Sequence, residues 1–288
     1  MTATPLDLDD LRAWVGRTHT ETDVVSATPA RALAATLGVA RTFAAGDALP
    51  PPWHWQYFLS MGPLDDAGPD GHPKRGGFLP PVPLPRRMWA GSRMTFVAPL
   101  RIGDAITRVS TIADVTAKEG RTGTLVFVKV RHAIAGPAGH ALSDEHDIVY
   151  RDLPRGGEAS PAPAPRAAPA AGAWRREVRP DPVLLFRYSA LTYNSHRIHY
   201  DHPYVTGVEG YPGLVVHGPL LATLLLDLLL RHVPGARVAQ FAFRAVKPVF
   251  DTASFFVCGE PAADGAGAVL WIADSDGFLC MDATATLG

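Results

Sequence analysis

Hydrophobic positions recur along this chain at helical spacing in some stretches and in strand-like runs in others. Near the start, Leu8, Leu11 and Trp14 stand three residues apart, which predicts an amphipathic helix. A second helical pattern covers 29–37 and ends at Gly38, a residue type that commonly closes a helix. Helices are therefore expected to open the first half of the chain.

Strand-like runs follow a proline-rich stretch at 62–85. They are rich in Val, Ile, Thr and Phe and are separated by turn-forming residues, which is typical of antiparallel strands. In the first half these runs cover 93–99, 105–115, 123–135 and 141–151. The second half repeats the plan, with a longer helix predicted over 219–231 and then strands over 238–246, 253–259, 268–274 and 278–287.

The predicted long helix carries leucines on most of its sides, for example Leu220, Leu224 and Leu228. Such a helix must be covered nearly all round. The apolar run at 214–230 is too short for a membrane span and contains His217 and Asp227, so a buried helix is favoured. A sheet wrapped around this helix would bury it.

The segment 155–172 is rich in Pro and Ala, and this composition predicts a linker. It separates an expected N-terminal domain (1–154) from an expected C-terminal domain (173–288) of similar plan. The pattern indicates an α+β fold of the double hot-dog type, in which each repeat is an antiparallel sheet wrapped around a helix. The first repeat is expected to be degenerate.

Composition narrows the class of protein. The 288 residues are 47% hydrophobic and 19% charged, with a formal net charge of −1, which gives no reason to expect a nucleic-acid or membrane partner. The start of the chain has no basic region followed by an apolar run, so no secretory signal is expected. Only Cys258 and Cys280 are present, and a cytoplasmic location is predicted.

Candidate chemistry is concentrated in one segment. The stretch 186–201 contains Asn194, His196 and His199, and it is followed by Gly218 at the start of the predicted helix. Aligned on His199, the stretch resembles the hydratase motif of MaoC-like (R)-specific enoyl-CoA hydratases, Asp-x-Asn-x-x-His. Asn194 then stands where that family has Asp, and His196 where it has Asn.

A wider resemblance covers nearly the whole chain. The stretches 77–91, 147–151 and 188–201 are similar to the hydroxyacyl-thioester dehydratase type 2 group, which includes mesaconyl-C4-CoA and itaconyl-CoA hydratases. The resemblance implies a hydro-lyase that adds water reversibly to a short α,β-unsaturated acyl-CoA. Coenzyme A would then be part of the substrate, and no separate cofactor is expected.

Hydration of a conjugated thioester places negative charge on the thioester oxygen, so hydrogen-bond donors must face that atom. The Gly218 N–H at a helix N-terminus is the predicted donor. His199 is the predicted acid or base, since its ordinary pKa is about 6.5. Asn194 cannot titrate, so it either positions water or serves as a turn residue. The second proton carrier stays open between His196, Asp201 and His199 acting alone.

Further residues are expected to bind the substrate. Arg86 and Arg87 are expected to contact a substrate carboxylate or the CoA phosphates, and Arg244 and Lys247 could also meet CoA phosphates. The full set of substrate-binding candidates is Arg86, Arg87, Trp89, Tyr193, His217, Arg244 and Lys247. The spacing of His196, His199 and His202 could suit a metal, but no Cys or carboxylate cluster completes such a site, so none is expected.

Two other functions are compatible with the same residues. A hot-dog acyl-CoA thioesterase would use the same oxyanion donor but direct water at the carbonyl carbon. A non-catalytic acyl-thioester binding module would fit the loss of the motif carboxylate at Asn194. The oligomeric state is open between a monomer and a homodimer, because a double hot-dog chain already contains the pairing that single-repeat relatives obtain by dimerising.

Overall fold

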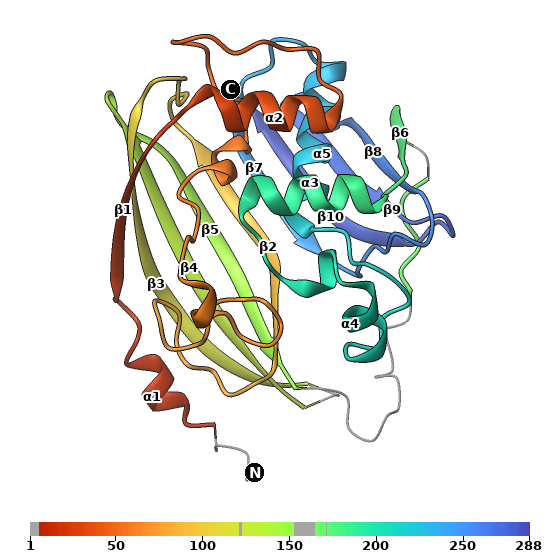
Figure 1. Ribbon diagram of the computed structural model, residues 1–288. Helices are drawn as coiled ribbons and strands as arrows, with labels where there is room; N and C mark the ends of the chain where they lie inside the picture. The colour runs from red at the N-terminus through yellow and green to blue at the C-terminus, as the bar shows by residue number, and fades with distance from the viewer. Residues whose placement is uncertain (1–5, 121–122, 153–164, 171) are drawn as a thin grey trace.

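The computed structural model describes residues 6–120, 123–152, 165–170 and 172–288. Ten strands form one continuous antiparallel sheet, in the order β1-β3-β4-β5-β2-β7-β10-β9-β8-β6 (Figure 1). The strands of the first half are β1 (Thr18–Val24), β2 (Arg86–Phe96), β3 (Ala105–Gly120), β4 (Gly123–Gly136) and β5 (Gly139–Arg151). Those of the second half are β6 (Trp174–Val178), β7 (Val238–Ala245), β8 (Phe255–Pro261), β9 (Gly267–Ala273) and β10 (Leu279–Leu287).

The two halves repeat one strand order. The first half reads 1-3-4-5-2, and the second, taken from its outer edge, reads 6-8-9-10-7, so each strand has a counterpart five strands later. The halves join where β2 pairs with β7, from Gly91 opposite Arg244 to Thr95 opposite Gln240. This edge-to-edge junction leaves neither β2 nor β7 as an exposed sheet edge.

The second half wraps around helix α5 (Gly218–His232), which packs against β6, β8, β9 and β10. Nine of its fifteen residues are buried, as its leucine content predicted. The acidic Asp227 is accommodated because its carboxylate pairs with Arg176 and Arg231, each at 2.8 Å. No helix within the described ranges is long and apolar enough to cross a membrane.

The remaining α-helices in the described ranges are α1 (Leu8–Arg12), α2 (Ala27–Leu37), α3 (Pro182–Thr192) and α4 (His202–Gly207), and short 3-10 helices include η1 (Trp53–Gln56) and η2 (Leu64–Asp66). Helix α2 packs against α3, across the boundary between the halves, rather than lying along its own sheet as α5 does (Figure 1). A second core cluster packs against strands β3, β4 and β5 of the first half, and the segment 78–84 contributes Val82 to it. The two repeats thus share a strand order and differ in which elements pack against their strands.

Most of the predicted elements are present with shifted ends. The helix expected over 29–37 begins at Ala27 and ends where Gly38 adopts a left-handed φ of 65°. Strand β2 begins at Arg86, seven residues before the predicted start, and β1, β6, α3 and α4 were not predicted. Of the predicted linker, 155–164 and 171 lie outside the described residues, whereas Ala167 forms a bridge with Phe278.

Candidate active site

The motif segment begins where helix α3 ends. Asp181 caps its first turn by accepting a hydrogen bond from Leu184 N at 2.8 Å. At its other end Tyr193 takes a left-handed conformation with φ 50°, unusual for a non-glycine residue, and turns the chain out of the helix. Asn194 N then donates to Ser189 O at 2.8 Å, which fixes the start of the motif.

His199 lies in the short 3-10 helix η4 (Arg197–His199), and its side chain is held by the strand-like segment that precedes α5. Its Nδ1 lies 2.7 Å from Val215 O, and Val215 N donates to Ile198 O at 2.9 Å. A carbonyl oxygen can only accept, so Nδ1 carries the hydrogen and Nε2 has a free lone pair. Burial is the main reason that the pKa of His199 is lowered to about 4. The imidazole is neutral at pH 7 and can act as a base.

His217 occupies the N-cap position of α5, and its ring is stacked on that of His199, with the ring centroids 3.7 Å apart. The neighbouring Val216 N donates to Val249 O at 2.8 Å, and this hydrogen bond helps to fix the segment that leads into α5. His217 Nε2 lies 2.8 Å from Ser189 Oγ, while its buried Nδ1 has no hydrogen-bond partner among the residues that the structure describes. Burial lowers the pKa of His217 well below its ordinary value, so this ring is neutral too.

Gly218 is the first residue of α5, and within the described part of the chain its N–H donates to no acceptor. A Cβ added at this position would meet no atom within 4 Å, so the space beside it is open. Pro219 follows without loss of a helical hydrogen bond, because the N–H of a first-turn residue has no acceptor within the helix. A free N–H at the positive end of the helix, beside open space, suits a developing oxyanion.

Asn194 makes a local turn. Its Oδ1 accepts a hydrogen bond from His196 N at 3.0 Å, the bond of an Asx turn. Asp201, the other alternative, accepts from Arg197 Nη2 at 2.7 Å and caps helix α4 through Tyr204 N. Both side chains are therefore occupied in holding the motif, which favours the turn reading of Asn194 and weakens Asp201 as a proton carrier.

A loop from the first half, residues 68–73, docks on the motif. Asp70 O accepts from Arg197 N at 2.9 Å, and Gly71 O accepts from Ser195 Oγ at 2.5 Å. A Cβ at Gly71, whose φ is 89°, would overlap the carbonyl oxygen of Ser195, so glycine is required for this close approach. The loop brings Asp70 and His72 to the site.

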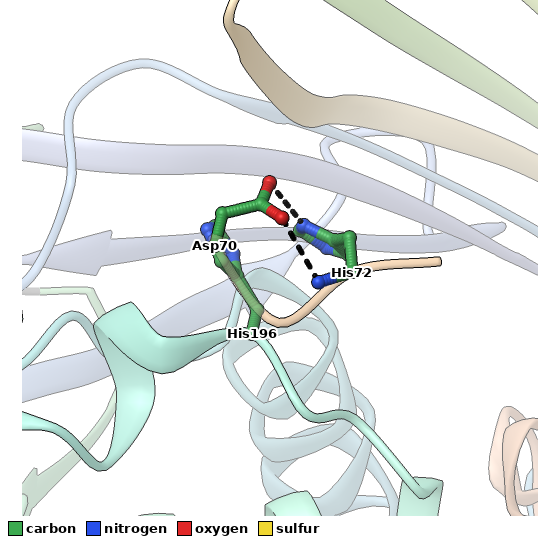
Figure 2. A group of neighbouring side chains, drawn as sticks. All are labelled: Asp70, His72 and His196. Carbon is green, nitrogen blue, oxygen red and sulfur yellow. Dashed lines mark hydrogen bonds and ion pairs between the residues drawn. The ribbon is translucent and has the colours of Figure 1, made fainter. Parts of the chain in front are cut away.

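Figure 2 shows Asp70, His72 and His196 together. Asp70 Oδ1 accepts from His72 N at 3.0 Å, and Asp70 Oδ2 lies 3.2 Å from His72 Nδ1. The His72 and His196 rings are 4.0 Å apart, and those of His196 and His199 are 5.5 Å apart. Hydrogen bonds and the nearby imidazoles hold the pKa of Asp70 below its ordinary range despite burial. Burial lowers the pKa of His72, and that of His196 to about 2.

Sequence reasoning did not single out Asp70 and His72. They belong to a proline- and glycine-rich stretch far from the motif, and only the Asp-x-His spacing could have drawn attention to them. Of the residues that it did single out, His196, His199, His217 and Gly218 come together, with Asn194 in the supporting turn.

The adjacent Arg86 and Arg87 differ in their surroundings. Arg86 Nε lies 3.1 Å from a Glu209 carboxylate oxygen, and Arg86 Nη2 donates to Glu209 O at 2.7 Å. Arg87 forms no ion pair within the described residues, and its charge is among the causes that lower the pKa of both His72 and His196. Arg87 therefore carries a positive charge near the histidine cluster that no carboxylate within the described residues pairs with.

The other substrate-binding candidates have partners elsewhere or face solvent. Trp89 packs against Trp55, His146 and Phe243 rather than against the motif. Arg244 lies on the opposite face of β7 from the core residue Phe243 and pairs with Asp282 at 2.7 Å. Lys247 pairs with Asp274, and the side chain of Tyr193 is exposed. None of these contacts brings them to His199.

Two hollows lie away from the histidines. One, of about 340 Å³, is lined by residues of β2 to β5 and by Arg244, and another, of about 210 Å³, by residues around Pro50 and Arg231. Neither is lined by a residue of the motif. The chemistry of the side chains therefore locates the site better than the size of the hollows.

One group among the described residues has the composition of a metal site, namely Asp70, His72 and His196, with candidate ligand atoms all within 4.8 Å of one another. The spacing considered from the sequence, His196 with His199 and His202, does not form such a group within the same residues.

Comparison with known proteins gives a consistent picture. The family model for hydroxyacyl-thioester dehydratase type 2 matches residues 52–251. The mesaconyl-C(4)-CoA hydratase of Chloroflexus aurantiacus is 46% identical over 281 residues, covering 97% of this chain and 98% of that protein.

Two solved structures share the fold at low identity. A MaoC-like dehydratase from Phytophthora capsici superposes with a TM-score of 0.65 at 14% identity, over 98% of this chain and 99% of the other. A Mycobacterium tuberculosis protein whose structure has a double hot-dog fold gives a TM-score of 0.58 at 15% identity, over 95% and 96% of the two chains. The predicted fold class is confirmed.

Proposed function

This chain belongs to the hydroxyacyl-thioester dehydratase type 2 family of hydro-lyases, and from that premise we propose that it hydrates a short unsaturated acyl-CoA, with mesaconyl-C4-CoA as the first candidate. The resemblance seen in the sequence is thereby confirmed at the level of the family. The observation that carries the proposal is the neutral His199, whose Nδ1–H is fixed on Val215 O and whose Nε2 is left free beside the α5 N-terminus.

The chemistry follows from these two groups. Water attacks the β-carbon while His199 Nε2 takes one of its protons, and the π electrons of the double bond move onto the thioester oxygen. The Gly218 N–H and the positive end of α5 stabilise that oxyanion. The enolate then collapses, and the α-carbon takes a proton back from His199. Reversal of these steps dehydrates the β-hydroxyacyl thioester.

Coenzyme A is part of the substrate, and the proposal includes no separate cofactor. A cytoplasmic location also belongs to the proposal and is supported by Cys258 and Cys280, both buried and unpaired. The proposal allows a monomer as well as a homodimer, since the β2–β7 pairing already joins two repeats within one chain.

The test is a direct assay of purified protein with mesaconyl-C4-CoA and with crotonyl-CoA. We expect loss of enoyl-thioester absorbance without release of free thiol, and a loss of activity of about 10²- to 10⁴-fold in His199→Ala. His202→Ala, an exposed histidine of α4, is the matched control and should keep full activity.

Other outcomes have definite meanings. Thiol release without loss of the double bond would identify a thioesterase that uses the same oxyanion donor. Tight binding of acyl-CoA with no turnover, unchanged in His199→Ala, would identify a binding module. No loss of enoyl absorbance with any short or long unsaturated thioester would contradict the hydratase.

A further inference from the structure

The motif of this chain lacks an available carboxylate. Asn194 stands at the position of the family's Asp and is bound into its own turn, and Asp201 is held by Arg197 and by the start of α4. A base that works alone must both hold the water and take its proton. The question is which other group holds the water molecule in line with the β-carbon.

We propose that His72, positioned by Asp70, is a second catalytic residue, which accepts a hydrogen bond from the attacking water while His199 takes the water's other proton. The inference rests on the proposed function and deepens it. The pair comes from the first half of the chain and reaches the motif through the docked loop 68–73.

The hydrogen-bond geometry sets the state of His72. Asp70 Oδ2, 3.2 Å from His72 Nδ1, is an acceptor when ionised, so the hydrogen resides on Nδ1 and the lone pair on Nε2. His199 has the same tautomer because Val215 O accepts from its Nδ1. The site therefore holds two imidazoles of the same kind, each with a free Nε2.

The two imidazoles belong to one cluster. The His196 ring contacts that of His72 at 4.0 Å and that of His199 at 5.5 Å, and His72 is among the groups that lower the pKa of His199. Within the described residues no hydrogen bond occupies Nε2 of His72 or of His199, whereas Nε2 of His217 is bound to Ser189 Oγ. Both nitrogens can therefore accept a hydrogen bond from water.

Two neutral acceptors suit the two hydrogens of one water molecule. When the water molecule donates one hydrogen bond to each Nε2, a lone pair on its oxygen is free to attack the β-carbon. Bond formation sends one proton to His199 Nε2, the double-bond electrons go to the thioester oxygen, and the α-carbon later takes that proton. His72 keeps its hydrogen bond throughout, and Asp70 fixes the orientation of its ring.

The experiment compares His72→Ala with His140→Ala, an exposed histidine of β5 in the same half of the chain. We expect His72→Ala to lower kcat by about 10²-fold for both mesaconyl-C4-CoA and crotonyl-CoA, with KM within about threefold, because water is common to both reactions. His140→Ala should leave both constants unchanged. A His72→Ala kcat within about threefold of the unsubstituted protein overturns the proposal.

The role of Asp70 has its own readout. Nitrogen NMR of histidine-labelled protein should show His72 as the Nδ1–H tautomer, a mixture of tautomers in Asp70→Ala, and restoration in Asp70→Asn, whose amide oxygen can still accept. This measurement does not depend on turnover and decides the matter if His72→Ala fails to fold. An Nε2–H tautomer in the unsubstituted protein overturns the proposal.

Asp70, His72 and His196 could instead hold a metal ion, and the same proteins test this. Retention of about one zinc per chain, with activity abolished by EDTA and restored by zinc alone, would overturn the water-holding role in favour of a metal site. We expect activity to survive EDTA. Inactivity of the unsubstituted protein on every unsaturated thioester would be a failure of the proposed function, distinct from all of these results.

Discussion

The rings of His199 and His217 lie stacked, with centroids 3.7 Å apart and planes inclined by 17°. A positive charge on either ring would face the other at this distance while both are buried, so burial and mutual repulsion favour the neutral pair. The stacked pair lies at the N-terminus of α5, because His217 is the N-cap of this helix. The arrangement places the neutral base directly beside the predicted oxyanion donor.

A pH profile tests the neutral base. The pKa of His199 is lowered to about 4, chiefly by burial, and the groups facing it are His72, His196 and His217. Activity requires the unprotonated imidazole, so kcat/KM should be full at pH 7 and fall only as the pH drops through about 4. Initial rates over this range, with circular dichroism at each pH, provide the measurement. An acid limb near the ordinary value of about 6.5 would contradict the buried neutral state.

The free energy of unfolding should also fall as the pH falls. Between about 6.5 and about 4 the unfolded chain binds a proton on His199 that the folded protein does not, so the free energy of unfolding falls as the pH falls. This residue alone should contribute a loss of about 3 kcal/mol, which then levels off below about pH 4. Urea unfolding at pH 7.5 and pH 5 should therefore show a smaller difference in His199→Asn than in the unsubstituted protein.

Substitution of Gly218 tests the oxyanion position. A Cβ there meets no protein atom within 4 Å, so Gly218→Ala should fold normally but narrow the space in which the thioester oxygen must approach the N–H. A loss of kcat/KM of about 10²-fold or more is expected, comparable to removal of one oxyanion donor. Gly207→Ala, at the end of α4 and equally free of clashes, is the control. Equal activity of the two variants would exclude close approach at Gly218.

Part of the site could be predicted from the sequence because the motif is local. Asn194 to His199 lie within one turn and a short 3-10 helix, so the spacing of these residues places them in one group. Gly218 stands beyond helix α4, and it was predicted from its place at the start of the apolar helix. The leucine pattern of α5 likewise determined which helix the sheet surrounds.

The rest depends on contacts distant in sequence. Asp70 reaches Arg197 only through the docked loop, whose approach depends on Gly71, and no periodic pattern marks this. The ring of Trp89 packs against those of Trp55 and Phe243, contacts between distant parts of the chain that no sequence pattern marks, and its role in substrate binding stays a prediction. Strands β1 and β6 were missed because edge strands have mostly exposed or half-buried positions and therefore little hydrophobic alternation.

A buried carboxylate in the first half should dominate local stability. Asp144 accepts hydrogen bonds from His54, Trp55, Ser92 and His146, and the neighbouring His146 and His54 hold its pKa well below the ordinary range despite burial. Asp144→Ala leaves four donors without this acceptor, of which His54 and Ser92 are buried, and should lower the free energy of unfolding by about 3–5 kcal/mol. Removal of the surface carboxylate in Asp282→Ala should cost no more than about 1 kcal/mol.

Denaturant unfolding of both variants at pH 7 is the measurement. The contribution of Asp144 is present above the ordinary carboxyl pKa of about 3.9 and is lost as the pH falls through the lower folded value. The two variants should therefore differ most at neutral pH. Equal stability would mean that the donors find water when the carboxylate is removed.

The neighbours Arg86 and Arg87 permit a matched test of substrate recognition. In mesaconyl-C4-CoA a free carboxylate is attached to the β-carbon, whereas crotonyl-CoA has none. Arg87 has no ion pair within the described residues and its charge acts on His72 and His196, so we expect it to bind that carboxylate. Arg86 is already neutralised by Glu209.

Arg87→Met should therefore lower kcat/KM for mesaconyl-C4-CoA by about 10²-fold, since a hydrogen bond to a charged group contributes about 1.5–3 kcal/mol, and leave crotonyl-CoA nearly unaffected. Arg86→Met removes a partly buried ion pair and should change both substrates by the same factor, together with a lower unfolding midpoint. Steady-state kinetics with the two thioesters separates the two arginines. If Arg86→Met showed the selective loss, Glu209 would have to release Arg86 on substrate binding, and the assignment of the carboxylate to Arg87 would be wrong.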